Sequence, residues 1–192
     1  MKEKIALAMI VKGEGEEYKK LDRCLTSVAP YIDGIFITVT GEPDKIQDTL
    51  GICEKYKAIV SYTRALYEPT EEAVKWLTDY FGYAPHMRIG QPLFMFDEAR
   101  NYNFSQVPKE YTWVMWLDSD DVLKDCQNLW KLLEVGQQAQ IDAFYLNYLY
   151  QVELDEKNNI KHILIKHLRE RVVRNSGDFK WIASIHETLI EQ

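Results

Sequence analysis

Hydrophobic residues in this 192-residue chain alternate between continuous runs and stretches with a helical spacing. Three largely apolar runs predict strands: residues 4–11, 34–39 and 58–62, of which the first is typical of a strand buried on both faces. Between the runs, apolar residues recur at three- and four-residue steps, as in amphipathic helices: Tyr18, Leu21, Leu25 and Val28, then Ile46, Leu50 and Cys53. Alternating strands and helices require crossover connections, so the pattern predicts an α/β fold with a doubly wound, Rossmann-like sheet.

The pattern changes after the third run. A further helix is expected from Thr70, which can cap it, to Gly82, which can end it. Its apolar face would consist of Val74, Leu77 and Phe81. Residues 83–94 contain Pro and Gly but have no periodicity, which indicates an exposed loop that leads toward a site. Asp97 is then expected to cap a short helix over residues 98–107.

The run WVMWLDSDDVL, residues 113–123, reads as a buried strand that stops at carboxylates. Asp118, Asp120 and Asp121 would lie at its carboxyl end, where open α/β sheets bind ligands. Three acids so close together repel one another unless a cation or hydrogen-bond donors offset their charge. A divalent metal carrying a phosphorylated ligand is the simplest such partner, because hard oxygen ligands suit magnesium and manganese.

A structural role for these acids is the alternative, because Asp residues also begin helices. Residues 121–136 are expected to form a helix with Leu129, Leu132 and Leu133 on one face and Gly136 as its stop signal. Capping accounts for one acid, however, and not for three. A calcium-binding hand is excluded, because Leu123 and Leu129 would stand where such a loop requires Gly and Glu.

The last third of the chain has a different character. Residues 141–175 are expected to be β-rich, with the KNN segment at 157–159 as a hairpin turn between two long strands. The sheet should therefore be mixed or antiparallel at this side. We expect one catalytic domain over 1–192, with a nucleotide-binding part at about 1–123 and an acceptor-side part at about 124–192.

Composition narrows the classes of partner. A net charge of −7 argues against a nucleic-acid surface or an anionic membrane surface, and phosphates would need local cations. The apolar runs are far shorter than the roughly 20 residues of a membrane span, and the amino terminus has no signal core, so a cytoplasmic protein without a transmembrane segment is expected. Cys24, Cys53 and Cys126 are read as small core residues.

Four segments together carry a family resemblance: LAMIVKGEGEEYKKLDRCLTSVAPYIDGIFI, FDEARNYNF, WVMWLDSDDVL and RVVRNSGDFKWIASIHETL. In this order they resemble family 2 glycosyltransferases with the A-type nucleotide-sugar transferase fold, especially small bacterial or phage enzymes. The resemblance implies a mixed sheet of the glycosyltransferase A type and metal-dependent, inverting transfer of a sugar. The donor would be a nucleotide diphosphate sugar, with UDP the expected nucleotide. The acceptor would be a carbohydrate, a lipid-linked molecule or a protein.

The resemblance assigns Asp120 to a manganese or magnesium ion that bridges the diphosphate. Asp118 would lie beside the ribose or in the water shell of the ion, and capping explains Asp121 as well as ligation does. His186 would approach the metal or the diphosphate, although a structural histidine is nearly as good an interpretation.

The resemblance places four further residues beside the donor: Val11, Glu14, Arg100 and Asn101. Arg100 would contact phosphate, because its planar fork donates two parallel hydrogen bonds. The alternative is a solvent-exposed helix arginine. Asn101 would orient the ribose or the neighbouring loop.

Inversion requires a base on the face of the sugar opposite the leaving group. Glu187, in the IHE element, is the candidate that would deprotonate the acceptor. Asp142 and Asp178 are the alternatives in the same half of the chain.

The chain departs from the family pattern at two positions. Gly13 stands where family members often carry Asn, and Val39 stands where an Asp usually recognises the base or the ribose. The Thr70 helix and the loop after it look like an insertion that shapes the acceptor side.

Two rival functions remain. Asp118-Ser-Asp120-Asp121-Val122 also fits the nucleophile motif of haloacid dehalogenase-type phosphohydrolases, in which Asp118 would attack phosphorus and Asp120 would act as acid and base. Those enzymes carry the motif near the amino terminus and a paired-acid loop downstream, and this chain has neither. The second rival is a nucleotide-sugar binding module without turnover.

Overall fold

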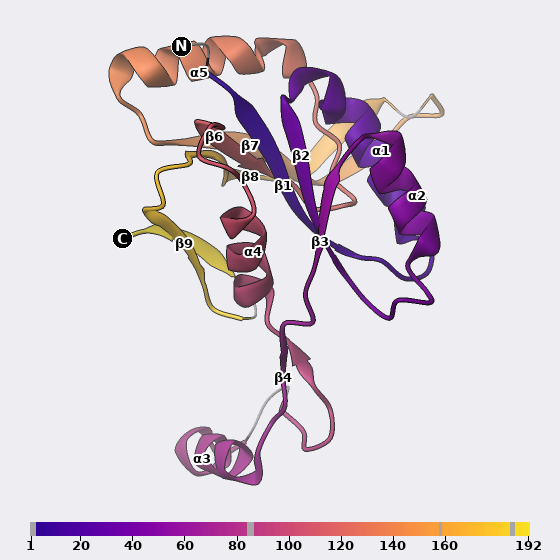
Figure 1. Ribbon diagram of the computed structural model, residues 1–192, viewed down its shortest axis with the longest axis vertical. Helices are drawn as coiled ribbons and strands as arrows, with labels where there is room; N and C mark the ends of the chain where they lie inside the picture. Colours follow the sequence, from indigo (N-terminus) through magenta and orange to yellow (C-terminus); the bar gives the residue numbers. More distant parts are fainter. Residues whose placement is uncertain (1–2, 84–86, 158, 185–186) are drawn as a thin grey trace.

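A six-stranded mixed sheet forms the centre of the protein, in a computed structural model that describes residues 3–83, 87–157, 159–184 and 187–192 (Figure 1). The strand order is β3-β2-β1-β6-β8-β7. The strands are β1 (Ile5–Lys12), β2 (Gly34–Thr40), β3 (Ile59–Tyr62), β6 (Trp113–Trp116), β7 (Ala143–Leu154) and β8 (Ile160–Arg174). Strands β3, β2, β1 and β6 are parallel, whereas β8 runs antiparallel to both β6 and β7. The predicted doubly wound mixed sheet with a β-rich carboxyl-terminal third is confirmed.

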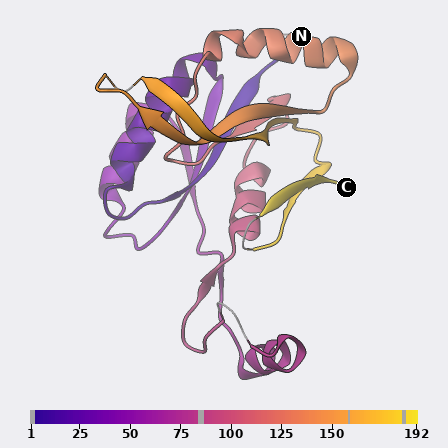
Figure 2. The same ribbon diagram turned by 180° about the vertical axis from the view of Figure 1, so that it is seen from behind.

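Helices cover both faces of the sheet. One face packs against α1 (Glu17–Val28), α2 (Gln47–Lys55) and α5 (Leu129–Ala139), and this core contains Cys24 and Cys53. The other face packs against α4 (Phe96–Ser105) and a hairpin made of β9 (Phe179–Ile182) and β10 (Thr188–Glu191), as Figure 2 shows from behind. No helix among the described residues is long and apolar enough to cross a bilayer.

Strands β7 and β8 continue well beyond the rest of the sheet. Only Val172, Val173 and Arg174 of β8 pair with β6, whereas the pairing of β8 with β7 extends to Leu154 and Ile160. Strands β7 and β8 form the predicted hairpin, and Asp155 N donates to Asn159 O at 2.9 Å; Asn158, within the turn predicted at 157–159, lies outside the described residues. We call the part of this hairpin beyond the sheet, residues 145–154 and 160–169, the ribbon.

The segment between β3 and α4 projects away from the sheet (Figure 1). Thr70 caps α3 (Glu71–Phe81) by accepting a hydrogen bond from Ala73 N at 3.2 Å, and Gly82 ends it with a φ of 79°, as predicted. The predicted loop after this helix contains strand β5 (Leu93–Phe94), which pairs with β4 (Leu66–Tyr67). We call residues 66–94, with α3 at the far end, the arm.

The predicted starts of two helices, α4 and α5, were wrong. Helix α4 begins at Phe96, one residue before the predicted cap Asp97. Asp97 instead lies in the first turn of the helix, where the positive end of the helix dipole stabilises its negative charge. Residues 118–125 form a loop, and a 3₁₀ turn at Cys126–Asn128 precedes α5. The acids after β6 therefore do not begin a helix.

Gly136 lies inside α5 and does not end it, because the helix continues to Ala139 and Gln140 closes it with a φ of 53°. The glycine serves close packing against the sheet. A Cβ added at Gly136 would lie 2.6 Å from Phe144 Cζ and 2.9 Å from Trp113 Cη2. The prediction that Gly136 ends the helix was therefore wrong, and this glycine is needed for close packing of α5 against the sheet.

Gly136→Ala is expected to lower the free energy of unfolding by about 1–2 kcal/mol, because overpacking against two rings outweighs the gain in helix propensity. Gly51→Ala in α2 is the matched control, since a Cβ there meets nothing within 4 Å. The control should raise the free energy of unfolding by about 0.5–1 kcal/mol. Urea unfolding of both variants measures this difference, and equal stabilities would contradict the packing role.

Candidate functional site

The acid loop lies at the carboxyl end of the parallel strands. Trp116, the last residue of β6, pairs with Ala8 of β1, and Asp118 follows two residues later. The loop closes on itself, because Asp121 N donates to Asp118 O and Asp118 N donates to Asp121 Oδ2, both at 3.1 Å. This edge is the ligand-binding crevice of open α/β sheets.

Helix α1 holds the loop from the side. Ser119 Oγ donates to Glu17 Oε2 at 3.0 Å, and Arg23 Nη2 donates to the backbone oxygen of Asp120 at 3.0 Å. These contacts fix the backbone of the acid loop and leave the Asp120 side chain exposed.

Arg100 is buried at the centre of the site, with 4% of the residue exposed. Its Nη2 donates to Asp118 Oδ1 at 2.7 Å, and its Nε donates to Glu187 Oε1 at 2.8 Å. The guanidinium carbon lies 4.6 Å from the centroid of Trp116 and 4.9 Å from that of Trp181. The solvent-exposed interpretation of Arg100 was therefore wrong, and this side chain joins α4, the acid loop and the carboxyl-terminal hairpin.

Arg171 is a second buried cation, which the sequence analysis did not identify. Its Nη2 lies 2.9 Å from Asp121 Oδ2, in an ion pair without a well-directed hydrogen bond, and its Nη1 lies 3.8 Å from Asp118 Oδ2. Its guanidinium stacks over Trp116 at 3.9 Å and Tyr148 at 4.9 Å. The only local signal was a charged residue beside the buried Val172 and Val173 in a strand.

The two arginines determine the charge of the acids. Burial by itself raises the pKa of Asp118, but the charge and hydrogen bond of Arg100, with the charge of Arg171, hold this pKa below its ordinary value. Burial dominates at Asp121 and raises its pKa, although Arg171 opposes the shift. Burial also lowers the pKa of Arg171. The cations that offset the acid cluster thus include side chains of the protein itself.

The Asp120 carboxylate makes no hydrogen bond or ion pair with the described residues. His186, predicted to join the same metal, lies outside the described residues. Within the described ranges, no three side chains of His, Cys, Asp or Glu gather as a ready metal cage. Asp120 can still serve as a single carboxylate ligand for an ion that a phosphate ligand also binds, which is how proteins often hold magnesium.

Asn101 fixes the carboxyl-terminal hairpin. Its Nδ2 donates to Trp181 O and its Oδ1 accepts from Trp181 N, both at 2.9 Å. Of the two roles considered for Asn101, orientation of the neighbouring chain therefore agrees with these contacts, because both polar atoms of the side chain are engaged.

The three base candidates are separated by the fold. Glu187 belongs to the Arg100 network, as described above. Asp142 precedes β7 and lies 3.5 Å from Arg174, which pairs with the amino end of β6, opposite the acid loop. Asp178 stands before β9, and its backbone oxygen accepts from Gln192 N near the chain end. Among the described residues, only Glu187 of the three candidates shares a hydrogen-bond partner, Arg100, with Asp118.

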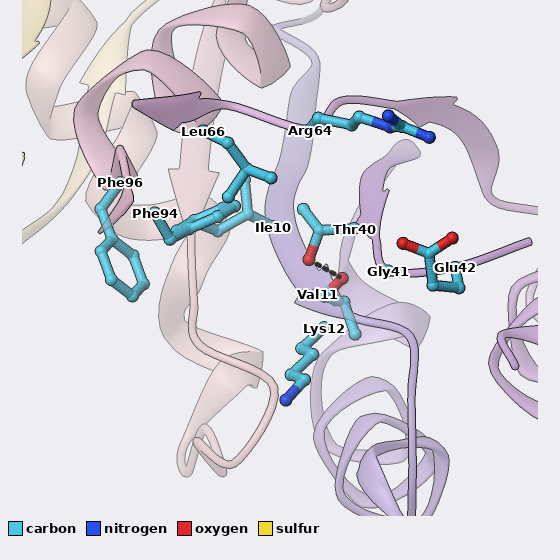
Figure 3. Close-up of a pocket in the computed structure, with 10 residues that line it drawn as sticks. All are labelled: Ile10, Val11, Lys12, Thr40, Gly41, Glu42, Arg64, Leu66, Phe94 and Phe96. Atoms are coloured by element: carbon cyan, nitrogen blue, oxygen red, sulfur yellow. Dashed lines mark hydrogen bonds between the residues drawn. The ribbon is translucent and has the colours of Figure 1, made fainter. Parts of the chain in front are cut away.

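A cavity of about 410 Å³ opens at the carboxyl ends of β1 and β2 (Figure 3). Its lining combines apolar residues with two cations and one acid: Ile10, Val11, Lys12, Thr40, Gly41, Glu42, Arg64, Leu66, Phe94 and Phe96. Leu66 and Phe94 are paired residues of the arm, so the root of the arm forms one wall. Val11 lines the cavity, whereas Glu14 accepts a hydrogen bond from Glu42 N at 3.0 Å and holds the loop behind it.

Val39 and Gly13 depart from the family pattern together. Val39 is buried, with 1% exposed, and a Cβ at Gly13 would lie 2.8 Å from both Ile46 Cβ and Val39 Cγ1. A glycine at 13 thus makes room for the apolar side chains of Ile46 and Val39. Thr40, at the end of β2, lines the cavity together with Gly41 and Glu42, so the carboxylate at this edge comes from Glu42 and not from position 39.

Lys12, Arg64 and Phe94 are cavity residues that sequence reasoning did not identify. Lys12 ends β1, and Arg64 follows β3, both positions where a parallel sheet collects ligand-binding groups. The strand-end rule could have found these two cations. Phe94 was read as part of a loop, and only its pairing with Leu66 brings it to the cavity.

Comparisons with solved structures reveal distant likenesses. A 4-diphosphocytidyl-2C-methyl-D-erythritol synthase from Anaerococcus prevotii aligns over 91% of this chain and 73% of its own, with 13% identity and a TM-score of 0.47. S. aureus TarS, residues 1–349, solved with UDP-GlcNAc, aligns over 83% of this chain and 37% of its own, with 15% identity and a TM-score of 0.43. Neither a protein-family model nor a curated protein sequence matches.

Arg100→Met is expected to lower the free energy of unfolding at neutral pH by about 3 kcal/mol, because it leaves the Asp118 and Glu187 carboxylates without their buried partner. The deficit should shrink in acid. Asp118 has a depressed pKa in the folded state, so its stabilising contribution is complete above its unfolded value, near 3.8, and is lost as pH falls through the lower folded value. Denaturant unfolding of wild type and variant across this pH range tests both statements.

Arg64→Met serves as the control, since it removes a cation from the cavity lining instead of the buried network. A surface cation contributes about 0–1 kcal/mol, so this variant should be close to wild type at every pH. Equal losses in the two variants would show that Arg100 is no more than an ordinary charged residue.

Proposed function

We propose that this chain is a glycosyltransferase of the family 2 type, which transfers a sugar with inversion from a nucleotide diphosphate sugar to an acceptor. The observation that carries the proposal is the convergence of separate motifs on one network: FDEARN supplies Arg100, WLDSDD supplies Asp118, RVVRN supplies Arg171 and IHE supplies Glu187. The network lies at the ligand-binding edge of a doubly wound sheet, as the glycosyltransferase A type requires.

The cavity supports a nucleotide as the bound group. Its volume of about 410 Å³ is within the range of small-molecule sites, and its wall offers apolar side chains for a base. Lys12 and Arg64 supply the local cations that a diphosphate needs in a protein with a net charge of −7. UDP is the nucleotide that the family resemblance favours.

Asp120 would hold a manganese or magnesium ion together with the phosphate oxygens, with His186 as a further proposed ligand. When bound, such an ion would neutralise the charge that develops on the leaving diphosphate. Asp118 keeps its negative charge through Arg100 and Arg171 and stays in place beside that position.

Glu187 is the proposed base, which accepts the proton of the acceptor as the acceptor attacks the sugar. Its side chain is 13% exposed, and Arg100 binds its Oε1, so its position is fixed. Fixed position is what general-base catalysis requires.

The phosphohydrolase alternative has weaker support. A nucleophilic Asp118 would need a free oxygen for attack on phosphorus. Both of its oxygens instead face guanidinium groups, Oδ1 at 2.7 Å from Arg100 and Oδ2 at 3.8 Å from Arg171.

Manganese with a UDP-sugar is expected to raise the melting temperature, and chelator should abolish the effect. Mass action predicts about 2.7 kcal/mol of stabilisation at a ligand concentration 100 times Kd. Asp120→Asn should remove the metal-dependent shift and the release of UDP while it leaves the unliganded melting temperature unchanged. Asp125→Asn is the control, because Asp125 is an exposed acid of the same loop whose φ of 60° suits Asn.

The three possible results separate the functions. A metal-dependent shift with UDP release supports transfer, whereas a shift without turnover under any acceptor or hydrolysis condition supports a binding module. Absence of any shift across a panel of nucleotide sugars would overturn the proposal.

Glu187→Gln should lower the rate of transfer by roughly 10²–10⁴-fold and leave donor affinity nearly unchanged, because the amide keeps the shape but cannot accept the proton. Asp142→Asn, at the opposite end of the sheet, should transfer at the wild-type rate. Calorimetry measures donor affinity, and product release measures transfer. Normal transfer by Glu187→Gln would move the base to another residue.

A further inference from the structure

The arm exposes an aromatic surface that the candidate site does not use. Trp76, Tyr80 and Phe81 of α3 are 60%, 71% and 56% exposed, and Trp76 and Tyr80 stack with ring centroids 5.5 Å apart. None of the residues of α3, all of which the structure describes, is buried. The apolar stripe of an amphipathic helix normally faces a core, so this stripe lacks its partner within the described chain.

The ribbon exposes apolar side chains on both of its faces, because successive residues of a strand point to opposite sides. The large exposed side chains of β8 are Ile163, Leu164, Ile165 and Leu168, and Leu168 is 62% exposed. Tyr150 of β7 adds to them with 64% exposed. A two-stranded ribbon is only marginally stable by itself in water, so a partner that covers these residues would stabilise it.

The two surfaces have opposite charge. Helix α3 carries Glu71, Glu72 and Asp79 against a single cation, Lys75. The ribbon carries Lys161, Lys166 and Arg169 against a single acid, Glu153. Contact between two arms would therefore bring acid against acid, and contact between two ribbons would bring base against base. Contact of an arm with a ribbon is attractive.

The two surfaces lie at opposite ends of the molecule. The arm is at the foot of the long axis in both views, whereas the ribbon lies near the other end (Figures 1 and 2). They cannot meet within one chain. A two-fold axis perpendicular to the long axis would bring each arm onto the ribbon of the other copy, and the two equal contacts would close the assembly.

We propose that this chain forms a two-fold dimer in which the arm of each copy docks on the ribbon of the other. The occupant of each exposed surface is thus a second copy of this chain, selected by matched apolar side chains and opposite charge. The proposal does not depend on the enzymatic function, because its evidence comes from surfaces outside the cavity and the acid loop.

Trp76→Glu on the arm and Leu168→Glu on the ribbon should each shift the protein from dimer to monomer, as measured by sedimentation equilibrium over a range of concentrations. Val135→Glu is the control, because Val135 is an exposed apolar residue of α5 outside both surfaces. It should sediment as the wild type does. Thermal melts of each variant verify that the sheet remains folded.

Mixing the two monomeric variants distinguishes this dimer from other assemblies. Trp76→Glu retains an intact ribbon and Leu168→Glu retains an intact arm, so the mixture has one complete contact and should form a heterodimer. Charge exchange gives a second test: Glu72→Lys and Lys166→Glu should each weaken the dimer, and the double variant should recover part of the affinity.

Several outcomes would overturn the proposal. These are a monomer at every concentration, a dimer that resists Trp76→Glu, or a Leu168→Glu variant that still dimerises. Failure of the mixed variants to associate would also contradict it. Binding of the monomer to neutral lipid vesicles through Trp76, without self-association, would assign the arm to a membrane surface instead.

Discussion

The site depends on one buried cation, the guanidinium of Arg100 between the rings of Trp116 and Trp181. A buried charge is unfavourable unless it is paired and hydrogen-bonded, so this position requires carboxylates on the open sides of the guanidinium. Asp118 and Glu187 meet that requirement from segments 69 residues apart in the sequence. The need to pair one arginine thus brings the end of β6 and the carboxyl-terminal hairpin to the same place.

This arrangement divides the acids of the loop into two kinds. Asp118 and Asp121 are paired with arginines and belong to the framework, whereas Asp120 is exposed and its carboxylate makes no ion pair with the described residues. Arg100 and Arg171 therefore let a protein with an overall negative charge concentrate acids at a ligand-binding edge. The open acid is available to ligands, and the paired acids define where it stands.

Local signals were sufficient for much of the fold and insufficient for the contacts within the site. Continuous apolar runs and helical spacing located β1, β2, α1 and the acid loop, because these patterns reflect burial in the neighbouring layers. Arg171 was missed because its partner Asp121 lies 50 positions earlier, and nothing in the strand sequence indicates that pairing. Gly136 was misread because packing against Phe144 and a helix stop use the same residue.

The narrow root of the arm has a consequence for how this chain can vary. Tyr67 and Leu93 are directly paired, so the chain leaves the root and returns to it at neighbouring positions, with Cα atoms about 4.5–5.5 Å apart. A two-residue turn such as Asn-Gly spans that gap in ordinary hairpins. The segment 68–92 can therefore change in length or sequence, in evolution or by design, without moving the ends of the root. Leu66 and Phe94 would then remain in the cavity wall.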